Sequence, residues 1–217
     1  MGADLTAQKV VEPRVARKRR SILAGALTVF GRVGYLSASI EMIAAEAGAS
    51  TRTIYNHFEN KEQLFITVLM ESSTRVAVTR EALIERHLGG PVEDLEAALV
   101  ALAKEWVRPS QDFDDHFRIV RRLRGEADRF PPEVVRSWQE AGPHRARRAL
   151  AARMATLAER GAIAVADPEL AAQQFMALVT DTTISRAEFS ATALESEIDR
   201  IARAGVHTFL HGYLPRR

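Results

Sequence analysis

The sequence contains no cysteine, and this absence excludes a disulfide framework, a thiolate zinc site and a cysteine nucleophile. It has no apolar run approaching the roughly 18 residues that a membrane-spanning helix needs, and its start lacks the apolar stretch of a secretory signal. A phosphate-cradling glycine loop and the GxSxG motif of serine hydrolases are also missing. We therefore expect a cytoplasmic protein with no membrane partner, no cofactor and no enzymatic activity.

Signals for β-strands are missing as well. Apolar residues recur every three or four positions, as at Ile22, Ala26 and Phe30, rather than at every second position. Glycine, proline and asparagine interrupt this pattern and divide the chain into about nine helices. The longest, expected over residues 60–88, would measure about 43 Å. Pro143 should break a later helix, because proline removes a backbone donor. The predicted fold class is all-α.

Positive charge is concentrated at one end of the chain. The net charge is only +2, but residues 1–61 carry nine Lys and Arg against five Asp and Glu, while residues 62–217 carry 21 against 23. The densest part lies between Arg14 and Arg20. A basic end on a nearly neutral protein indicates a polyanionic partner. Charge alone does not distinguish a segment that binds a polyanion from a segment that is merely solvated. We expect a flexible basic arm at residues 1–17.

A pair of short helices joined by a tight turn is expected just before the long helix. The first covers Ile40–Ala47 and the second Ser50–Asn56, with Gly48 in the turn. Glycine tolerates a positive φ, which lets two helices meet steeply within a few residues. The serine that begins the second helix can cap it. Asn60 with Gln63 resembles a capping box for the long helix.

The second helix of this pair presents polar, non-acidic side chains. Arg52 can read a guanine edge, Asn56 an adenine edge, and a threonine methyl a thymine. Hydroxyls, amides and cations nearby suit phosphate contacts. No acidic residue occurs from Gly48 to Phe58, which favours double-stranded DNA over the alternative of a hairpin with a merely polar outer face. The candidate DNA-contacting residues are Ser39, Ser50, Thr51, Arg52, Thr53, Tyr55, Asn56, His57 and Lys61.

Short stretches between residues 19 and 69 follow one another with a distinctive spacing. They read FGRVGY from Phe30, IA from Ile43, AGAS from Ala47, TIYNHF from Thr53 and KEQLF from Lys61. In order and spacing they resemble the DNA-binding domain of the TetR family of bacterial transcriptional regulators. The resemblance implies that the second short helix is the recognition helix and that Tyr55 and Lys61 contact phosphates. It also implies a homodimer that reads a palindromic operator.

Residues 113–190 carry a second likeness, in the text RRLRGEADRFPPEV, WQEAGP and DPELAAQQFMALV. They resemble the C-terminal part of the AefR-like subgroup of the same family. Together the two likenesses imply a flexible basic arm at residues 1–17, a helix-turn-helix domain at 18–60, and a ligand-binding and dimerisation domain at 61–217. The implied function is a repressor that an unknown small-molecule effector releases from its operator.

The effector pocket and the dimer interface are expected in the second part of the chain. An effector pocket combines apolar walls with a few polar groups, and each candidate can also be read as ordinary core. The candidate pocket residues are Trp106, His116, Phe117, Arg121, Trp138 and Phe175. By resemblance the last two helices, about 168–188 and 192–212, should pair with their copies, unless their apolar faces simply complete the monomer's core. The candidate interface residues are Leu178, Ile198 and Ile201.

Two polar clusters suggest other chemistry. The segment from Asp112 to His116 could hold a metal in an all-α metal-dependent phosphohydrolase. Carboxylates are also favoured at a helix N-terminus, which is the simpler interpretation. His207 and His211 are four residues apart, as in zinc sites, but no glutamate between them completes HExxH. We therefore expect no metal, and prefer packing or hydrogen bonding for both histidines.

Overall fold

The computed structural model describes residues 14–108, 111–125, 130–181 and 195–213, and all regular structure in these ranges is helical. The expected all-α fold is confirmed. Within the same ranges, no helix is both long enough and apolar enough to cross a membrane. The chain divides into two compact units, which we call the N-terminal unit and the C-terminal unit. The first contains residues 14–69 and 115–125, and the second contains the other described residues.

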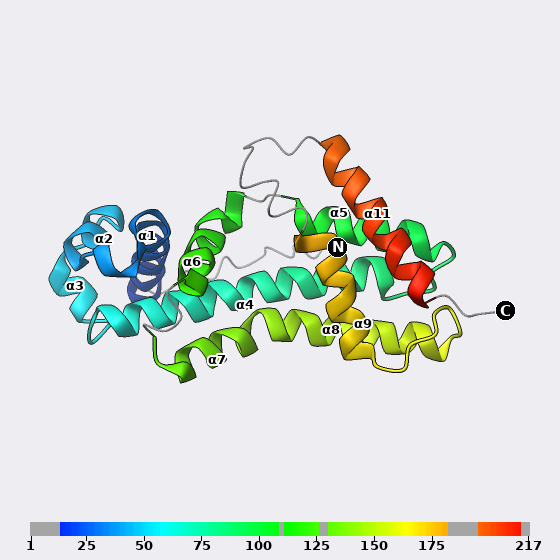
Figure 1. Cartoon of the computed structure of the whole chain (residues 1–217). Helices are drawn as coiled ribbons and strands as arrows, with labels where there is room; N and C mark the ends of the chain where they lie inside the picture. Colours follow the sequence, from blue (N-terminus) through cyan, green and yellow to red (C-terminus); the bar gives the residue numbers. More distant parts are fainter. Residues whose placement is uncertain (1–13, 109–110, 126–129, 182–194, 214–217) are drawn as a thin grey trace, which may run out of the picture. The chain divides into compact units, whose positions relative to one another are not determined.

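The N-terminal unit is built around its first helix. Its elements are α1 (Arg14–Ser37), α2 (Ile40–Glu46), α3 (Thr51–Tyr55), the first part of α4 (Lys61–Leu88) and nearly all of α6 (Asp114–Gly125). Helices α2 and α3 lie on one side of α1 and α6 lies on the other (Figure 1). Because α1 begins at Arg14, the last four residues of the expected arm are helical, and residues 1–13 lie outside the described part.

Two glycines shape α1. At Gly25 an added Cβ would lie 2.9 Å from the Ala47 backbone nitrogen, so a side chain here would force α1 and α2 apart. At Gly34 the backbone has φ 82° and ψ 168°, which kinks the end of α1. L residues other than glycine rarely adopt that conformation. Inside the unit, the rings of Phe30 and Phe65 meet edge to face with centroids 5.0 Å apart.

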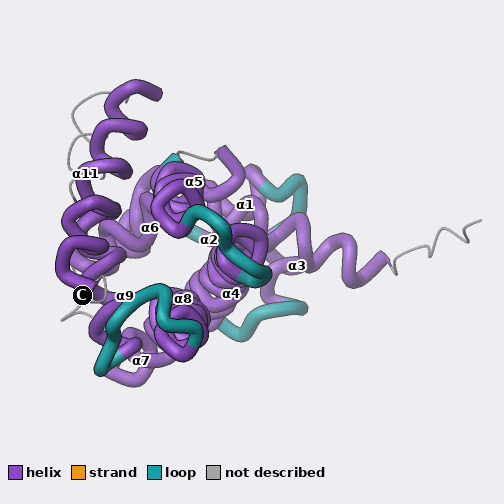
Figure 2. The backbone as a smooth tube through the Cα atoms, turned by 90° about the vertical axis from the view of Figure 1, so that its right-hand side faces the viewer, coloured by secondary structure: helices purple, strands orange, loops and turns teal. Residues whose placement is uncertain are grey.

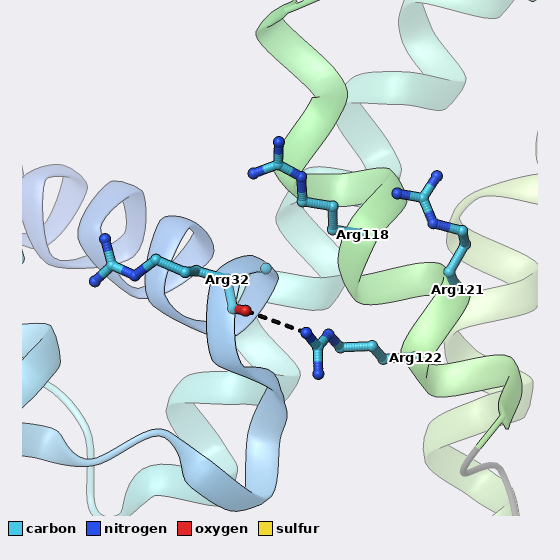
Figure 3. Close-up of a pocket in the computed structure, with 5 residues that line it drawn as sticks. Arg32, Arg118, Arg121 and Arg122 are labelled. Atoms are coloured by element: carbon cyan, nitrogen blue, oxygen red, sulfur yellow. Dashed lines mark hydrogen bonds between the residues drawn. The ribbon is translucent and has the colours of Figure 1, made fainter. Parts of the chain in front are cut away.

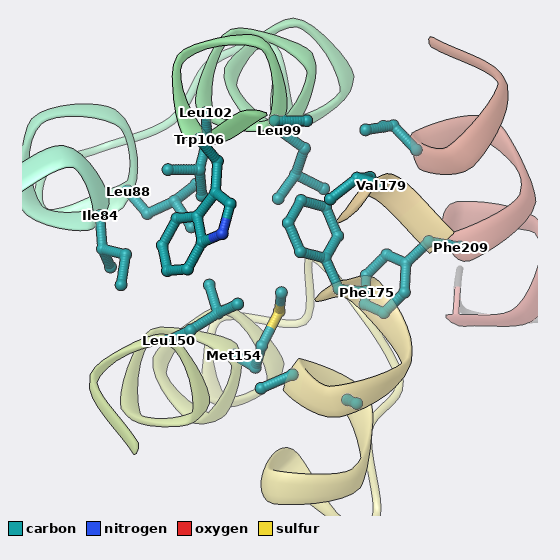
Figure 4. Packing of buried hydrophobic residues seen from close by; sticks show 14 of the residues in the cluster. Ile84, Leu88, Leu99, Leu102, Trp106, Leu150, Met154, Phe175, Val179 and Phe209 are labelled. Carbon is teal, nitrogen blue, oxygen red and sulfur yellow. The ribbon is translucent and has the colours of Figure 1, made fainter. Parts of the chain in front are cut away.

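The C-terminal unit consists of longer helices around a larger apolar core. Its elements are the rest of α4, α5 (Leu95–Val107), η1 (Gln111–Phe113), α7 (Pro132–Ala141), α8 (Pro143–Glu159), α9 (Pro168–Met176), the π-helical turn η3 (Ala177–Asp181) and α11 (Glu195–Tyr213). Helix α9 packs on α8, and α11 packs on α5 (Figure 2). Figure 4 shows the core between them, where Trp106, Met154 and Phe175 converge.

Helix α4 confirms the expected long helix, and the boundary between the units falls inside it, after Leu69. In the C-terminal unit, Glu81 accepts two hydrogen bonds from Arg145 of α8, at 2.6 and 2.7 Å. The expected break at Pro143 is also confirmed. Gly142 has φ −118° and ψ −93°, and Pro143 begins α8 where a missing backbone N–H costs nothing.

Candidate nucleic-acid interface

Serine side chains begin both short helices of the N-terminal unit. Ser39 accepts a hydrogen bond from the Met42 backbone N–H at 3.2 Å, and Ser50 accepts one from Thr53 at 3.1 Å. Such caps satisfy amides that have no partner inside the helix. A hydrogen bond from its own backbone N–H, then one from the Ser39 hydroxyl, lowers the pKa of Glu41. Both serines therefore serve local structure first.

Three interactions fix the angle between α2 and α3. Gly48 has φ 56°, as the tight turn requires. The Lys18 ammonium donates to the Gly48 carbonyl oxygen at 2.6 Å, and the Ser21 hydroxyl donates to that of Ala47 at 2.8 Å. Sequence reasoning assigned no role to Lys18 or Ser21, since only the fold brings α1 against this turn.

Helix α3 turns a polar surface to solvent. Arg52 and Asn56 are exposed, and Tyr55 is 55% exposed although it is aromatic. Thr51 and His57 are half-buried. Ile54, fully buried, anchors the opposite face of the helix to the core. The structure thus brings all the candidate residues of α3 together on or beside one outward surface, with neutral or cationic groups only.

Lys61, a candidate DNA contact, also makes hydrogen bonds within the chain at the start of α4. Its ammonium donates to the carbonyl oxygens of Tyr35 at 3.1 Å and Ala38 at 2.9 Å, and lies 4.7 Å from the centre of the Tyr35 ring. Two of its three N–H groups are thereby used within the chain. Burial, and secondarily the charge of Glu62, raises the pKa of Tyr35. Lys61 therefore ties α4 to the end of α1.

The start of α4 is capped as the sequence suggested, with one difference. Asn60 Oδ1 accepts from the Gln63 backbone N–H at 2.8 Å. In a regular capping box the Gln63 side chain would return to the backbone of the cap residue. Here Gln63 Oε1 accepts instead from the Glu59 backbone N–H at 2.6 Å, one residue earlier.

In the acidic cluster at the start of α6, Asp115 is engaged in packing. Asp115 accepts a hydrogen bond from the Thr28 hydroxyl at 2.9 Å and pairs with Arg118 at 3.3 Å. His116 is 4% exposed, and Asp112 points to solvent. Within the described ranges, no three acidic or histidine side chains are grouped as metal ligands. The phosphohydrolase interpretation is not supported.

Comparison with known families decides the assignment. Residues 22–68 match the model of bacterial regulatory proteins of the tetR family, and residues 97–215, more than half of the chain, match that of the C-terminal domain of AefR-like transcriptional repressors. The chain belongs to the TetR family. Both likenesses inferred from the sequence are confirmed, and the surface of α3 lies within the first of the two matched segments.

Relatives in the TetR family extend the match over most of the chain. A TetR-family transcriptional regulator from Mesorhizobium loti has a TM-score of 0.81 and 30% identity, and covers 94% of this chain and 100% of its own. The flavonoid-responsive regulator FrrA has a TM-score of 0.66 and 28% sequence identity, and the match covers 93% of this chain and 100% of FrrA. The transcriptional repressor Rv1474c of Mycobacterium tuberculosis is 33% identical over 61% of this chain. The chain matches 62% of that repressor's length, less than two thirds.

The six candidate pocket residues fall into both units of this TetR-family chain. Trp106, Trp138 and Phe175 are buried in the C-terminal unit, and Trp106 and Phe175 belong to the same apolar cluster (Figure 4). The other three lie on α6 in the N-terminal unit and are His116, Phe117 and Arg121. The structure therefore groups Trp106 with Phe175 in one apolar cluster, of which Trp138 is not a member.

Sequence reasoning missed two polar residues of α4 in the C-terminal unit. Ser73 is 1% exposed, and its hydroxyl, like the Trp138 indole N–H, finds no hydrogen-bond partner among the described residues. Arg80 lies two turns further along α4, with its guanidinium carbon 4.5 Å from the centre of the Trp106 ring. Burial lowers the pKa of Arg80 to about 10. Positions 73, 77, 80 and 84 lie on one face of α4, and Ala77 and Ile84 are buried there. This spacing in the sequence could have indicated that Ser73 and Arg80 face the core.

The candidate dimer residues are largely covered within one chain. Ile198 and Ile201 of α11 are 3% and 5% exposed, and Leu178 of η3 packs against the C-terminal core. Other side chains of these helices are exposed to solvent, and among them Leu170 of α9 is 46% exposed. His207 and His211 are also exposed, with ring centroids 4.2 Å apart.

Proposed function

We propose that this chain is a sequence-specific DNA-binding transcriptional regulator, a repressor that a small-molecule effector releases from a palindromic operator. The observation that carries the proposal is the outward face of α3, which is polar, free of acidic residues and fixed by its caps. The helix-turn-helix domain is assigned to residues 18–60, and ligand binding and dimerisation to residues 61–217. No catalytic step is assigned to the chain, and chromosomal DNA as target implies action in the cytoplasm.

Base reading is assigned to the exposed side chains of α3. Arg52 suits the O6 and N7 acceptors of guanine, and Asn56 suits adenine. The Tyr55 hydroxyl, the remaining Lys61 donor and the side chains of Thr51 and His57 suit phosphates. Ser39 and Ser50 cap helices, so their contribution to DNA binding is to hold amides and side chains in position.

Fluorescence anisotropy with a duplex selected from random sequence tests this assignment. The wild type should bind the selected duplex far more tightly than a scrambled one, with affinity falling steeply as salt rises. Arg52→Ala should lose about 10- to 100-fold of that preference, the value of one bidentate base contact. Arg136→Ala, an exposed arginine of the C-terminal unit, is the matched control and should bind like the wild type. Equal binding to both duplexes would overturn the proposal.

We place the homodimer interface on the solvent-facing sides of α9 and α11. Two recognition helices must lie about 34 Å apart to enter successive major grooves, which requires a second copy of the chain. Since Ile198 and Ile201 are buried within the chain, Leu170 and Ala204 are better probes. Leu170→Glu with Ala204→Glu should yield folded monomers by light scattering. A folded variant that stays dimeric would move the interface elsewhere.

The effector site is placed in the C-terminal unit, beside Trp106. Ser73 of α4 lies against the end of α7, since a Cβ on Gly142 would lie 3.1 Å from Ser73 Cβ, and Arg80, further along α4, lies over the Trp106 ring. A buried donor without a partner costs about 1–3 kcal/mol, a cost that a ligand with acceptor oxygens relieves. With Arg80 nearby, the preferred effector is an organic acid with a flat apolar body. FrrA, named as flavonoid-responsive, is also a regulator that answers to a small molecule.

Thermal shift with benzoate, benzamide and benzyltrimethylammonium tests the preferred charge. Benzoate should raise the melting temperature most, because only it supplies a carboxylate to Arg80. Arg80→Gln should remove the difference between benzoate and benzamide, whereas Arg136→Gln should not. A larger shift with the ammonium compound would exclude an anionic effector while leaving the DNA-binding assignment untouched.

A further inference from the structure

Four arginines line one open groove of the N-terminal unit, with a volume of about 350 Å³. Arg32 comes from α1, and Arg118, Arg121 and Arg122 come from α6, with Gly31 completing the wall (Figure 3). All five residues belong to the same compact unit. None of these five residues belongs to α3, and the function proposed above assigns no role to the groove.

The carboxylates beside the groove leave it positively charged. Glu46 pairs with Arg32 at 3.2 Å, and Asp115 pairs with Arg118 at 3.3 Å. Arg122 donates to the Arg32 carbonyl oxygen at 3.1 Å, so its charge is not balanced by that contact. Arg121 forms no ion pair with any other described residue. Two uncompensated guanidiniums in one groove repel each other, and an anion between them would relieve that repulsion.

The walls of the groove are held at a fixed separation. A Cβ on Gly31 would lie 3.1 Å from the Asp115 carbonyl oxygen, so only glycine allows α6 to approach α1 this closely. The hydrogen bond from Thr28 to Asp115, at 2.9 Å, and that from Arg122 to Arg32 hold the same crossing. The guanidiniums are therefore presented from a preformed surface, which lowers the ordering cost of binding.

We propose that this groove binds the phosphate group of a small ligand. A guanidinium offers two parallel N–H donors that match two phosphate oxygens, and a dianion balances the two unpaired charges. A volume near 350 Å³ is at the small end of ligand sites. The groove lies where α6 meets α1, on the side of α1 away from α3, and α2 reaches it at Glu46, which pairs with Arg32 (Figure 1). A separate phosphate compound is therefore favoured over the backbone of DNA read by α3.

The connectivity of α6 gives such a ligand a regulatory effect. Asp114, where α6 begins, and Phe130, the next described residue after α6, both belong to the C-terminal unit, so α6 is attached to that unit at both ends. A phosphate held by Arg121 and Arg122, the second of which is hydrogen-bonded to the Arg32 carbonyl oxygen of α1, stabilises the arrangement in which α6 rests on α1. It changes DNA affinity to the extent that it binds this arrangement better than others.

Isothermal titration of the full chain with inorganic pyrophosphate, at constant ionic strength set with sodium chloride, tests the site. Arg121→Gln should weaken binding about tenfold through loss of charge-assisted hydrogen bonds. Arg124→Gln removes the same charge from an exposed position of the same helix outside the groove, and should bind within about twofold of the wild type. Circular dichroism checks that both variants are folded.

The possible results separate a local site from general positive charge. Equal weakening by Arg124→Gln, or no binding by the wild type, would overturn the proposal. A scrambled DNA duplex that displaces pyrophosphate from the wild type but not from Arg52→Ala would also overturn it, since the anion would then sit on the DNA-binding face. Operator binding by Arg121→Gln is measured separately. If this variant still binds the operator, the proposed DNA-binding function stands even when the phosphate-site proposal is wrong.

Discussion

In the N-terminal unit, the side chains that cap the recognition helix and the helices beside it find partners three residues away along the chain. Ser39, Ser50 and Asn60 each cap the helix that follows them. In the C-terminal unit, Ser73 and Trp138 are buried on helices far apart in the sequence, and no described residue satisfies their donors. Ser39 and Ser50 thus stabilise helix ends in one unit, whereas Ser73 in the other unit has a hydroxyl that no described residue satisfies.

The difference reflects what each unit is proposed to bind. DNA meets an exposed surface, so the N-terminal unit needs a rigid, internally satisfied scaffold that presents side chains outward. The proposed effector is enclosed, so the donors of the C-terminal unit that no described residue satisfies would find their partners on the ligand. Comparing equivalent substitutions in the two units tests this distinction.

The largest effect is expected where helices cross most tightly. Gly25→Val should destabilise the N-terminal unit by about 3 kcal/mol, because its Cβ would meet the backbone of Ala47 and backbone cannot move aside. Urea unfolding followed by circular dichroism measures the loss. Gly212→Ala in α11 is the control, since no atom lies within 4 Å of its added Cβ and alanine favours a helix. Equal losses in both variants would mean that crowding at Gly25 is not the cause.

Removal of the cap of the recognition helix should have a moderate effect. Ser50→Ala deprives the Thr53 N–H of its acceptor at 3.1 Å and should cost about 1 kcal/mol of unfolding free energy. Ser50→Asp, which keeps an acceptor, should recover most of that stability while weakening DNA binding through its negative charge. If alanine and aspartate behaved alike in stability, the cap would have no energetic importance.

The same substitution in the C-terminal unit should have the opposite sign. Ser73→Ala removes a buried hydroxyl that has no partner among the described residues, so the ligand-free protein should gain up to about 1 kcal/mol. Benzoate should then raise the melting temperature of this variant less than that of the wild type. A loss of stability similar to that of Ser50→Ala would show that the Ser73 hydroxyl is satisfied in the free protein.

The smallest effect concerns an ion-pair cluster on the surface of α11. Hydrogen bonds from Arg203, then from Lys104, lower the pKa of Asp199 to about 2 from its usual 3.8. A lowered folded-state pKa contributes stability above the unfolded value and loses it as pH falls toward the folded one. Asp199→Asn should therefore melt slightly below the wild type at pH 7, and the gap should close between about pH 5 and 2. A gap independent of pH would assign the effect to hydrogen bonding alone.

Elements with local signals could be predicted from the sequence. The two short helices differ from the expected ranges by one residue at their ends, and the cap at Ser50, the turn at Gly48 and the break at Pro143 are all present. Each depends on residues within one turn of helix. Gly31, one of the glycines expected to interrupt the helical pattern, is helical and buried, and α6 packs against it.

Features that depend on distant contacts could not be predicted. Assigning Arg121 to an effector pocket with Trp138 required knowing where α6 lies, and the structure instead places Arg121 in the arginine groove. Ile198 and Ile201 carry the periodicity of a helix interface, but periodicity does not distinguish a partner chain from the chain's own core. Lys61 was chosen as a phosphate contact, and only the fold reveals its two carbonyl partners.

The division of the chain has a consequence for its synthesis. Because the N-terminal unit takes α6 from residues 115–125, a ribosome that has translated as far as Leu69 has not yet supplied all of that unit. At roughly 5–20 residues per second, synthesis through the end of the missing helix takes about 3–11 s longer. Until then Gly31 faces no α6, and half of the arginine groove does not exist. Chimeras that exchange only the first 69 residues between relatives would likewise inherit one wall of the groove without the other.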